Sequence, residues 1–446
     1  MGAGTARGGA CLLISGNVRK NMEFVVFAGV LLLLFIFMIV QELIQTKNQE
    51  KLFKKYLREN YGKEPPKEYS LERFARLGSY LERHKEEKQL DDITWNDLGM
   101  DEVFRRIDRT YSAAGEEYLY YTLRNISCGR EAMEHLEEVV NWLQEQEDIK
   151  VRIQLLMKRL GHLGKYSLYD YLDNLDYLGE RSNRKIVLGN LLYLPFLLLL
   201  FVQPAMGTIG IVLCMLWHIM TYFREKKVIE PYIISFAYVL RLIDVCEELE
   251  KQKIPVYRRE LDELREVLKS LRELRRGSYW VMAGNQGKIG GNPLDILADY
   301  LRMILHLDIF QFNRMLEKLR KKTGQVETML AITGYLDMAI SVGGFRKSLE
   351  GYCIPKLEED TEKAFLHMKK GWHPLLSQPV KNSIRADRGI LLTGSNASGK
   401  STFLKMVAVN AVLAQTIHTC TAESYHAPVF RIFSSMALRD SIQNGE

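Results

Sequence analysis

"GILLTGSNASGKSTFLK", from Gly389 to Lys405, contains the most specific motif of this chain. Its centre, residues 394–401, fits the pattern G-x-x-x-x-G-K-S without a mismatch. The apolar run Ile390–Thr393 before it suits a short buried parallel strand, and "TFLKMVAVNAVLAQ" after it favours a helix. Strand, loop and helix in this order are the context that identifies a phosphate-binding loop (P-loop).

The chemistry of such a loop follows from its backbone. The glycines let the chain curl until successive N–H groups face the phosphates, and the start of the helix adds a partial positive charge. We expect Lys400 to reach the β- and γ-phosphates of ATP and Ser401 to ligate Mg²⁺. The predicted nucleotide-binding residues of the loop are Gly394, Ser395, Asn396, Ala397, Ser398, Gly399, Lys400 and Ser401.

The loop and its surroundings resemble those of MutS-type ATPases, the DNA mismatch repair family, whose loop reads T-G-x-N-x-x-G-K-S-T. Asn396 stands at the family's loop asparagine, and the pattern adds Thr402 to the predicted site. Upstream, "GWHPLL" resembles the start of the family's ATPase domain with Trp372 replacing an arginine, so the resemblance implies that His373 lines the adenine side. Downstream, Asp440 and Gly445 match a signature whose serine would follow Glu446.

Two helical motifs extend the resemblance. "DRTYSAAGEEYLYYTLRN", residues 108–125, resembles the start of the family's core domain. "LAITGYLDMAISVGGFRKSLEGYCIPKL", residues 330–357, resembles its lever helix, with a D-x-x-x-S pattern at Asp337 and Ser341. The resemblance runs from about residue 92 to the C-terminus and excludes the apolar segments described next; membrane-anchored members of the family are the most similar.

Two apolar zones predict membrane spans. Residues 24–40 carry no charge and would cover roughly 25 Å as a helix, close to the thickness of a hydrocarbon core. Residues 186–223 form a second zone that "QPAMG" splits into a helical hairpin. Basic residues flank this zone on both sides, which predicts that both of its ends are cytoplasmic. These basic residues are Arg181, Arg184, Lys185, Arg224, Lys226 and Lys227.

Between and after these zones the sequence favours helices. Residues 133–163 place apolar side chains at helical spacing, and Leu261, Leu264, Leu268 and Leu271 form a stripe typical of an intramolecular helix contact. Pro255 marks a helix start or a helix break just before this stripe, and helix resumes from Leu294 to about Leu349. "GNQGKIGGNP", residues 284–293, is Gly-rich but lacks the Ser or Thr of a P-loop, so we interpret it as a flexible connector.

The composition limits the class of protein, the number of domains and the kinds of partner. The chain has 446 residues, 47% apolar and 26% charged, with a net charge of +6. Most of it is therefore expected to be globular, in roughly two to four domains, and the charge permits contact with anionic lipid or nucleic acid without requiring either. Six cysteines show no metal-ligand or redox spacing, which is typical of small buried residues in a reducing compartment. They are Cys11, Cys128, Cys214, Cys246, Cys353 and Cys420.

Together these patterns predict a mainly α-helical, membrane-anchored protein with a C-terminal partial α/β P-loop ATPase domain of the ABC/MutS type. The expected parts are an N-terminal extension at 1–22, a transmembrane helix at 23–44, a helical core-like region at 45–185, transmembrane helices at 186–203 and 207–223, a lever-like region at 224–357 and the partial ATPase domain at 358–446. We expect a multi-pass membrane location, with the soluble regions cytoplasmic.

Some parts of a MutS-type enzyme are missing from this sequence. No apolar strand ending in an acid, the Walker B motif, follows Ser401, so we expect a truncated form without hydrolytic competence; the resemblance alone leaves open whether the chain is an enzyme. The F-x-E motif of the family's mismatch reader occurs only as Phe223-Arg224-Glu225, at the end of a predicted span. DNA as a partner, and a homodimer through a complete ATPase domain, are implied only by the resemblance.

Three functions therefore stay open. The first is a membrane-anchored, MutS-like ATP-binding protein with ATP-dependent binding of DNA. The second is half of an ABC-type transporter, which would need more spans than the sequence offers. The third is a non-catalytic membrane scaffold whose partial ATPase domain binds nucleotide poorly or not at all. The expected partners are ATP with Mg²⁺, membrane lipid and, by resemblance, DNA.

Overall fold

The computed structural model describes residues 37–435, except 39, 42–43, 64–68, 70, 86–88, 127–128, 164–166, 273–292, 360–363 and 396–398. The predicted N-terminal extension, most of the predicted span 23–44, nearly all of the connector 284–293, and Asp440 and Gly445 lie outside the described residues. The chain divides into two compact units, Met1–Glu59 with Gly290–Pro293, and Asn60–Ile289 with Leu294–Glu446. In the first unit, residues 44–59 are helical.

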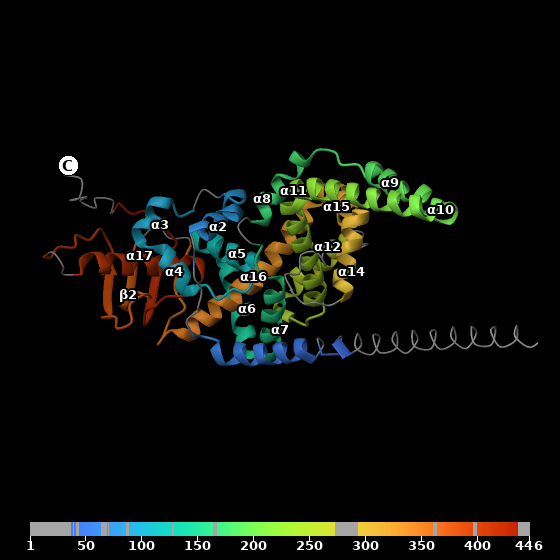
Figure 1. The fold of residues 1–446 in the computed structure, drawn as a ribbon. Coiled ribbons are helices and arrows are strands. Elements are labelled where there is room, and N and C mark those ends of the chain that lie inside the picture. The colour runs from blue at the N-terminus through green and yellow to red at the C-terminus, as the bar shows by residue number, and fades with distance from the viewer. Residues whose placement is uncertain are drawn as a thin grey trace, which may run out of the picture. The chain divides into compact units, whose positions relative to one another are not determined.

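The second unit is mainly helical, as predicted (Figure 1). Up to the hairpin its elements are α2 Leu71–Arg83, α3 Asp92–Leu98, α4 Met100–Ile107, α5 Ala113–Arg124, α6 Arg130–Glu145, α7 Glu147–Leu160, α8 Leu168–Asp173 and the 3-10 helix η1 Leu175–Leu178. Further on come α9 Arg184–Leu191, α10 Tyr193–Val202, α11 Pro204–Glu250, η2 Pro255–Tyr257, α12 Arg258–Leu271, α14 Pro293–Leu305, α15 Leu307–Arg320 and α16 Thr323–Ser348. The helix start at Pro255 and the helices from 293 to 348 confirm those predictions.

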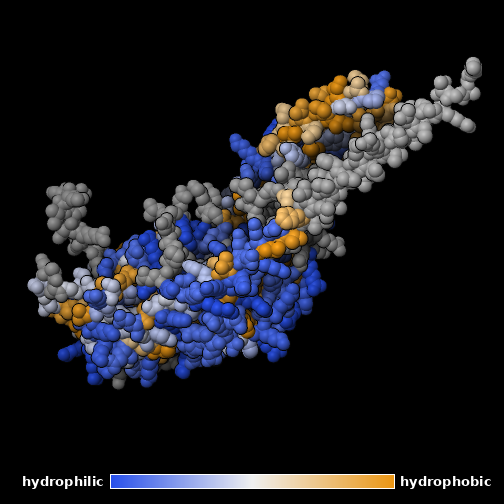
Figure 2. All heavy atoms as spheres, turned by 60° about the horizontal axis from the view of Figure 1, so that its bottom comes forward, coloured by the Kyte–Doolittle hydropathy of each residue, from blue (hydrophilic) through white to orange (hydrophobic). Residues whose placement is uncertain are grey.

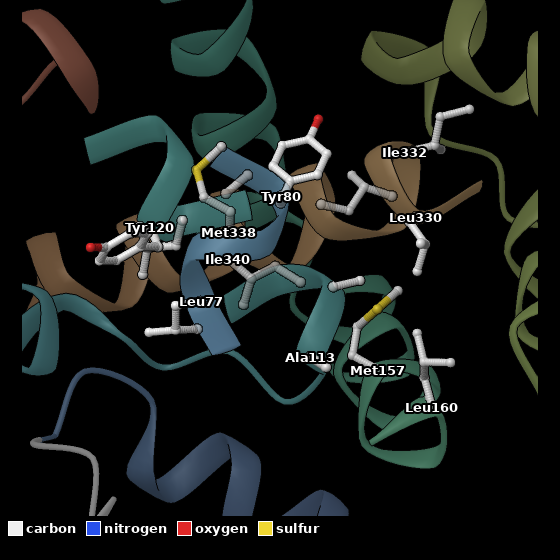
Figure 3. Close-up of a cluster of buried hydrophobic side chains, with 14 of the residues drawn as sticks. Leu77, Tyr80, Ala113, Tyr120, Met157, Leu160, Leu330, Ile332, Met338 and Ile340 are labelled. Atoms are coloured by element: carbon white, nitrogen blue, oxygen red, sulfur yellow. The ribbon is translucent and has the colours of Figure 1, made fainter. Parts of the chain in front are cut away.

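Helix α16 is the centre of the helical core (Figure 1). It packs against α5, α6 and α12, and apolar side chains from α2, α5, α7 and α16 interlock around it (Figure 3). By length and composition alone α16 could cross a membrane, but 83% of its most apolar window is buried inside the protein. Its hydrophobicity is therefore that of a core helix.

Small residues let α5 and α16 approach closely. A Cβ atom on Gly115 of α5 would lie 2.4 Å from Oδ2 of Asp337, and one on Gly334 of α16 would lie 2.6 Å from the carbonyl oxygen of Ala114. Neither distance is compatible with a side chain at these positions, so both glycines are needed for this helix crossing.

The second apolar zone forms a helical hairpin that turns at Gln203. Helix α10 packs against the start of α11, where Cβ atoms on Gly207 or Gly210 would clash with Leu200 or Phe196. The outward side chains are apolar and exposed, and they form the large orange surface in Figure 2. The segments Arg184–Val202 and Pro204–Glu250 are long and apolar enough to cross a membrane.

The hairpin differs in detail from the prediction. Its first arm is two helices, α9 and α10, that meet at Leu192. Its second arm continues well past Phe223, because α11 runs unbroken for 47 residues, about 70 Å at the usual rise. The basic residues after Phe223 are good helix formers, and the C-terminal half of α11 is held by burial in the core, for example at Phe236 and Ile243. One continuous helix therefore joins the apolar hairpin to the core.

Four strands form a small mixed sheet in the order β1-β4-β2-β3. They are β1 Lys356–Glu358, β2 Leu366–Gly371, β3 Asn382–Ala386 and β4 Ser424–Pro428. Strand β4 pairs in parallel with β1 and antiparallel with β2, which pairs antiparallel with β3. Helix α17, Lys400–Thr416, packs against β2 and, on the helical side, against α3 and α5.

The prediction of a strand at Ile390–Thr393 is wrong. Residues 389–395 are irregular, and Ile390 and Leu391 are 54% and 88% exposed. A strand buried on both faces needs hydrogen-bonding neighbours on both sides. Strand β3 is the edge of the sheet, and among the described residues no strand pairs with this run.

Candidate nucleotide-binding site

At the start of α17, a glycine in a left-handed conformation directly precedes the helix. Gly399, directly before the helix, has φ 83° and ψ 13°, in the left-handed region that a residue with a Cβ rarely adopts. The helix begins at Lys400 and runs for 17 residues, and the first N–H groups of any α-helix lack partners within it. These groups and the helix dipole favour an anion at this end.

The side chain of Lys400 closes the loop. Its ammonium donates hydrogen bonds to the carbonyl oxygens of Gly394 at 2.5 Å and Ser395 at 2.6 Å. The first and last parts of the predicted loop are therefore held together across residues 396–398. Ser401 and Thr402 follow Lys400 in the first turn of α17 and are exposed.

Six of the ten predicted site residues are brought together at this point. They are Gly394, Ser395, Gly399, Lys400, Ser401 and Thr402. Three more, Asn396, Ala397 and Ser398, lie outside the described residues. The tenth is His373.

His373 lies next to α17 but farther along it. The segment before it is fixed by Asn410, whose Nδ2 donates to the carbonyl oxygen of Trp372 at 3.1 Å, and the imidazole Nδ1 accepts from the N–H of Leu375 at 3.4 Å. Burial, with a smaller effect from Lys405, lowers the pKa of His373. The imidazole is therefore neutral at neutral pH, which suits contact with an uncharged aromatic base.

Arg346, near the end of α16, ties the far end of α17 to the helical core. It is 1% exposed, and its guanidinium donates to both carboxylate oxygens of Glu137 on α6, at 2.8 and 3.0 Å. It also donates to Oγ1 of Thr419 at 2.9 Å and to the carbonyl oxygen of His418 at 3.0 Å. Burial opposes the shift, but hydrogen bonds from His418 and Arg346 lower the pKa of Glu137 to about 2.

Sequence reasoning missed this junction. Glu137, Arg346 and Thr419 are far apart in the chain, and no local spacing relates them. An arginine among apolar residues near the end of a core helix was the one available signal, because a buried guanidinium requires a partner.

The D-x-x-x-S pattern of α16 also acquires a structural role. Asp337 accepts hydrogen bonds from the turn before α5, and Ser341 Oγ accepts from the N–H of Arg109 and donates to the carbonyl oxygen of Ile107, both at 2.8 Å. The two helical motifs singled out in the sequence thus bind each other. Among the described residues, the hydrogen bonds of the Lys400 ammonium go to the loop's own carbonyl oxygens and not to either motif.

Other predicted features have structural roles. Phe223, Arg224 and Glu225 lie within α11, where Glu225 pairs with Arg181. Among the described residues, no group of three or more His, Cys, Asp or Glu side chains is arranged to hold a metal ion.

Part of this chain is similar in sequence to DNA mismatch repair proteins MutS. No family model matches the chain. A DNA mismatch repair protein MutS from Pseudothermotoga lettingae is 30% identical over 143 residues, which is 30% of this chain and 17% of that protein. MutS of Pelotomaculum thermopropionicum is 33% identical over 169 residues, 34% of this chain and 19% of that protein. MutS of Thermotoga maritima is 32% identical over 115 residues, 24% of this chain and 14% of that protein.

The chain thus spans less than a fifth of the length of these curated relatives. The similarity covers about a third of this chain at most. It supports a relationship between this chain and the MutS family.

Proposed function

We propose that this chain binds ATP with Mg²⁺ at the loop 394–401 and acts as a membrane-anchored protein related to MutS. The observation that carries the proposal is the junction of loop and helix. Gly399 takes the left-handed conformation, α17 starts at the next residue, and the Lys400 ammonium spans the loop.

The residues at this junction fit a bound nucleotide. Lys400 would exchange its two carbonyl partners for phosphate oxygens, which form stronger, charge-assisted bonds. Ser401 would ligate Mg²⁺, and the Thr402 hydroxyl would contact phosphate. His373, uncharged and beside α17, would lie toward the adenine. The bound metal would neutralise charge between the β- and γ-phosphates.

The binding test uses the full chain in detergent. Lys400→Ala should weaken the binding of a fluorescent ATP analogue at least tenfold, because it removes the ammonium that spans the loop. The matched control is Lys356→Ala, which removes an exposed lysine of β1 and should leave the affinity unchanged. Equal affinity of Lys400→Ala and the unmodified protein would mean that the loop does not hold phosphate.

The hairpin supports membrane anchoring. Its outer surface includes Leu198, Phe201 and Val202, which are 68%, 89% and 78% exposed. Exposure of this much apolar surface is costly in water and favourable in a bilayer. The basic residues that flank the hairpin are suited to the lipid headgroup level on the cytoplasmic side.

Topology can be tested with alkaline phosphatase, which is active only outside the cytoplasm of a bacterial host. An insertion after Gln203, at the tip of the hairpin, should be active, and one after Lys253, beyond α11, should be inactive. Activity at both sites, or at neither, would contradict a hairpin that crosses the membrane with its ends inside.

DNA binding is proposed from the relationship to MutS. Gel shifts with homoduplex and mismatched duplex, with and without ATP, test it directly. Preference for the mismatched duplex would support mismatch recognition. Negligible binding to both duplexes would remove DNA as the client of this chain.

A second candidate is a non-catalytic scaffold, and one observation favours it. The exposed run at Ile390 and Leu391 leaves the loop without the strand that normally supports a P-loop. If nucleotide affinity is unmeasurable and the hairpin still inserts, this second function holds. A transporter half is less well supported, since of the three apolar helices described, α16 is buried in the core.

A further inference from the structure

The fold places two cysteines from distant parts of the chain directly opposite each other. Cys353 lies between α16 and β1, and Cys420 lies between α17 and β4. They form an isolated antiparallel bridge in which each N–H donates to the carbonyl oxygen of the other residue, at 2.9 and 3.0 Å. Residues paired in this way have Cα atoms about 5.5 Å apart, within the span of a disulfide.

The two thiols differ in environment. Cys353 is partly exposed, and a hydrogen bond from the Cys420 side chain lowers the pKa of its thiol. Cys420 is fully buried, burial raises the pKa of its thiol well above the usual value, and its sulfur also lies 3.6 Å from the carbonyl oxygen of Asn410. Cys353 is therefore the accessible nucleophile, and Cys420 is a protonated thiol held beside it.

We propose that Cys353 and Cys420 are a site of reversible oxidative modification, forming a disulfide with each other when the protein meets a hydroperoxide. The Cys353 thiolate attacks one peroxide oxygen, the O–O bond breaks, and the departing hydroxide takes up a proton to leave as water. The resulting sulfenic acid is attacked by the sulfur of Cys420. The S–O bond breaks, the S–S bond forms, and the hydroxide leaves as water with the proton of Cys420. Two thiols and one hydrogen peroxide thus yield one disulfide and two water molecules.

The position of the bond gives it a structural consequence. It would join the segment after α16 covalently to the turn after α17. The neighbours of Cys420 already hold that turn in place: Thr419 accepts from Arg346, and Thr421 Oγ1 donates to the carbonyl oxygen of Trp372 at 2.6 Å. The disulfide would therefore lock the segment after α16 to the turn after α17, and Thr421 of that turn holds the loop that carries His373. A thiol pair of this kind in a reducing compartment is typical of redox-sensing rather than structural disulfides.

The test uses the purified full-length chain in detergent, treated with stoichiometric hydrogen peroxide. Free thiols are alkylated, the protein is digested without reduction, and peptides are identified by mass spectrometry. We expect a linked peptide pair containing Cys353 and Cys420, loss of two alkylatable thiols, and full recovery after dithiothreitol. The oxidised protein should also melt several degrees higher than the reduced protein.

Matched variants separate this site from other thiols. Cys353→Ser and Cys420→Ser should each abolish the linked pair, and Cys246→Ser, which alters a buried cysteine on α11, should leave it intact. If a variant fails to fold, the peptide analysis of the oxidised unmodified protein still shows whether Cys353 and Cys420 are linked. Alkylation of both Cys353 and Cys420 after peroxide, or linkage of either to another cysteine, would overturn the proposal. None of these outcomes depends on nucleotide or lipid binding.

Discussion

Asp337 on α16 accepts two hydrogen bonds from Ser112, from its N–H at 2.8 Å and from its hydroxyl at 2.6 Å. Ser112 is the N-cap of α5, and its Oγ also accepts from the N–H of Gly115 at 3.0 Å. One carboxylate therefore fixes both the start of α5 and its contact with α16. Both side chains are fully buried, so water does not compete for these hydrogen bonds.

Replacing Asp337 should destabilise the core. Asp337→Ala leaves the buried hydroxyl and amides of the turn without an acceptor, and we expect the free energy of unfolding to fall by about 3 kcal/mol. Chemical denaturation in detergent, followed by circular dichroism, measures it. Asp262→Ala, at an exposed acid of α12, is the control and should change stability by less than about 1 kcal/mol. Equal effects of the two variants would contradict the assigned role.

The helix crossing predicts opposite outcomes at two glycines of α16. Gly334→Ala places a methyl group against the backbone of α5 and should destabilise the protein by about 1–3 kcal/mol. Gly324→Ala, in the first turn of the same helix with nothing within 4 Å, should leave stability unchanged or raise it by up to about 1 kcal/mol. Thermal melts of both variants measure these changes in stability. A Gly334→Ala variant as stable as the unmodified protein would disprove the close helix crossing.

Glu117 predicts a pH dependence. Burial raises its pKa to about 8, from an ordinary value of 4.5, despite a hydrogen bond from Ser167. The native state therefore keeps a proton that the unfolded chain loses above its ordinary pKa, so this contribution to stability falls as the pH rises from about 4.5 to about 8. Glu117→Gln cannot lose a proton. Its melting temperature should depend less on pH between about pH 5 and about pH 8 than that of the unmodified protein, and parallel pH profiles would refute this.

Glu137 predicts the reverse dependence at acidic pH. Its pKa is lowered to about 2, so its ion pair with Arg346 contributes stability above its ordinary pKa of 4.5 and loses it as the pH falls toward 2. Glu137→Gln should be less stable than the unmodified protein at neutral pH, and the difference should shrink on acidification. The readout is the thermal midpoint across the acidic range. Glu134→Gln, an exposed acid on the same helix, is the control and should match the unmodified protein throughout.

Gly399 predicts a local effect on nucleotide binding. A side chain at φ 83° is strained, so Gly399→Ala should distort the loop and weaken ATP binding severalfold. Gly389→Ala, at an open position without positive φ, is the control and should bind as the unmodified protein does. Equilibrium titration with a fluorescent nucleotide measures both. Unchanged affinity in Gly399→Ala would show that the left-handed glycine is not needed for binding.

The helical architecture was largely predictable because its signals are local. Apolar spacing over residues 133–163 and 261–271 predicted helices that the structure contains, and the apolar zone at 186–223 predicted a hairpin. The helix predicted over residues 402–415 is present as α17, which begins two residues earlier, at Lys400. The phosphate-binding role of the loop 394–401 stays a prediction.

The prediction of a strand at Ile390–Thr393 was wrong because strand formation depends on non-local contacts. A run of apolar residues suits a strand, but whether it becomes one depends on hydrogen-bonding neighbours that sequence spacing does not reveal. The continuation of α11 past Phe223 was missed in a similar way, since burial of its second half against α7, α12 and α16 extends the helix.

Local patterns predicted the main helices, the apolar hairpin and the approximate position of α17, because each of these depends on residues close together in the chain. Three contacts could not be predicted from local patterns: Asp337 holds the start of α5, Arg346 joins α16 to the end of α17, and Cys353 faces Cys420. Those relationships depend on packing between distant segments, and the energy of burying polar groups with their partners is realised only once the chain has folded.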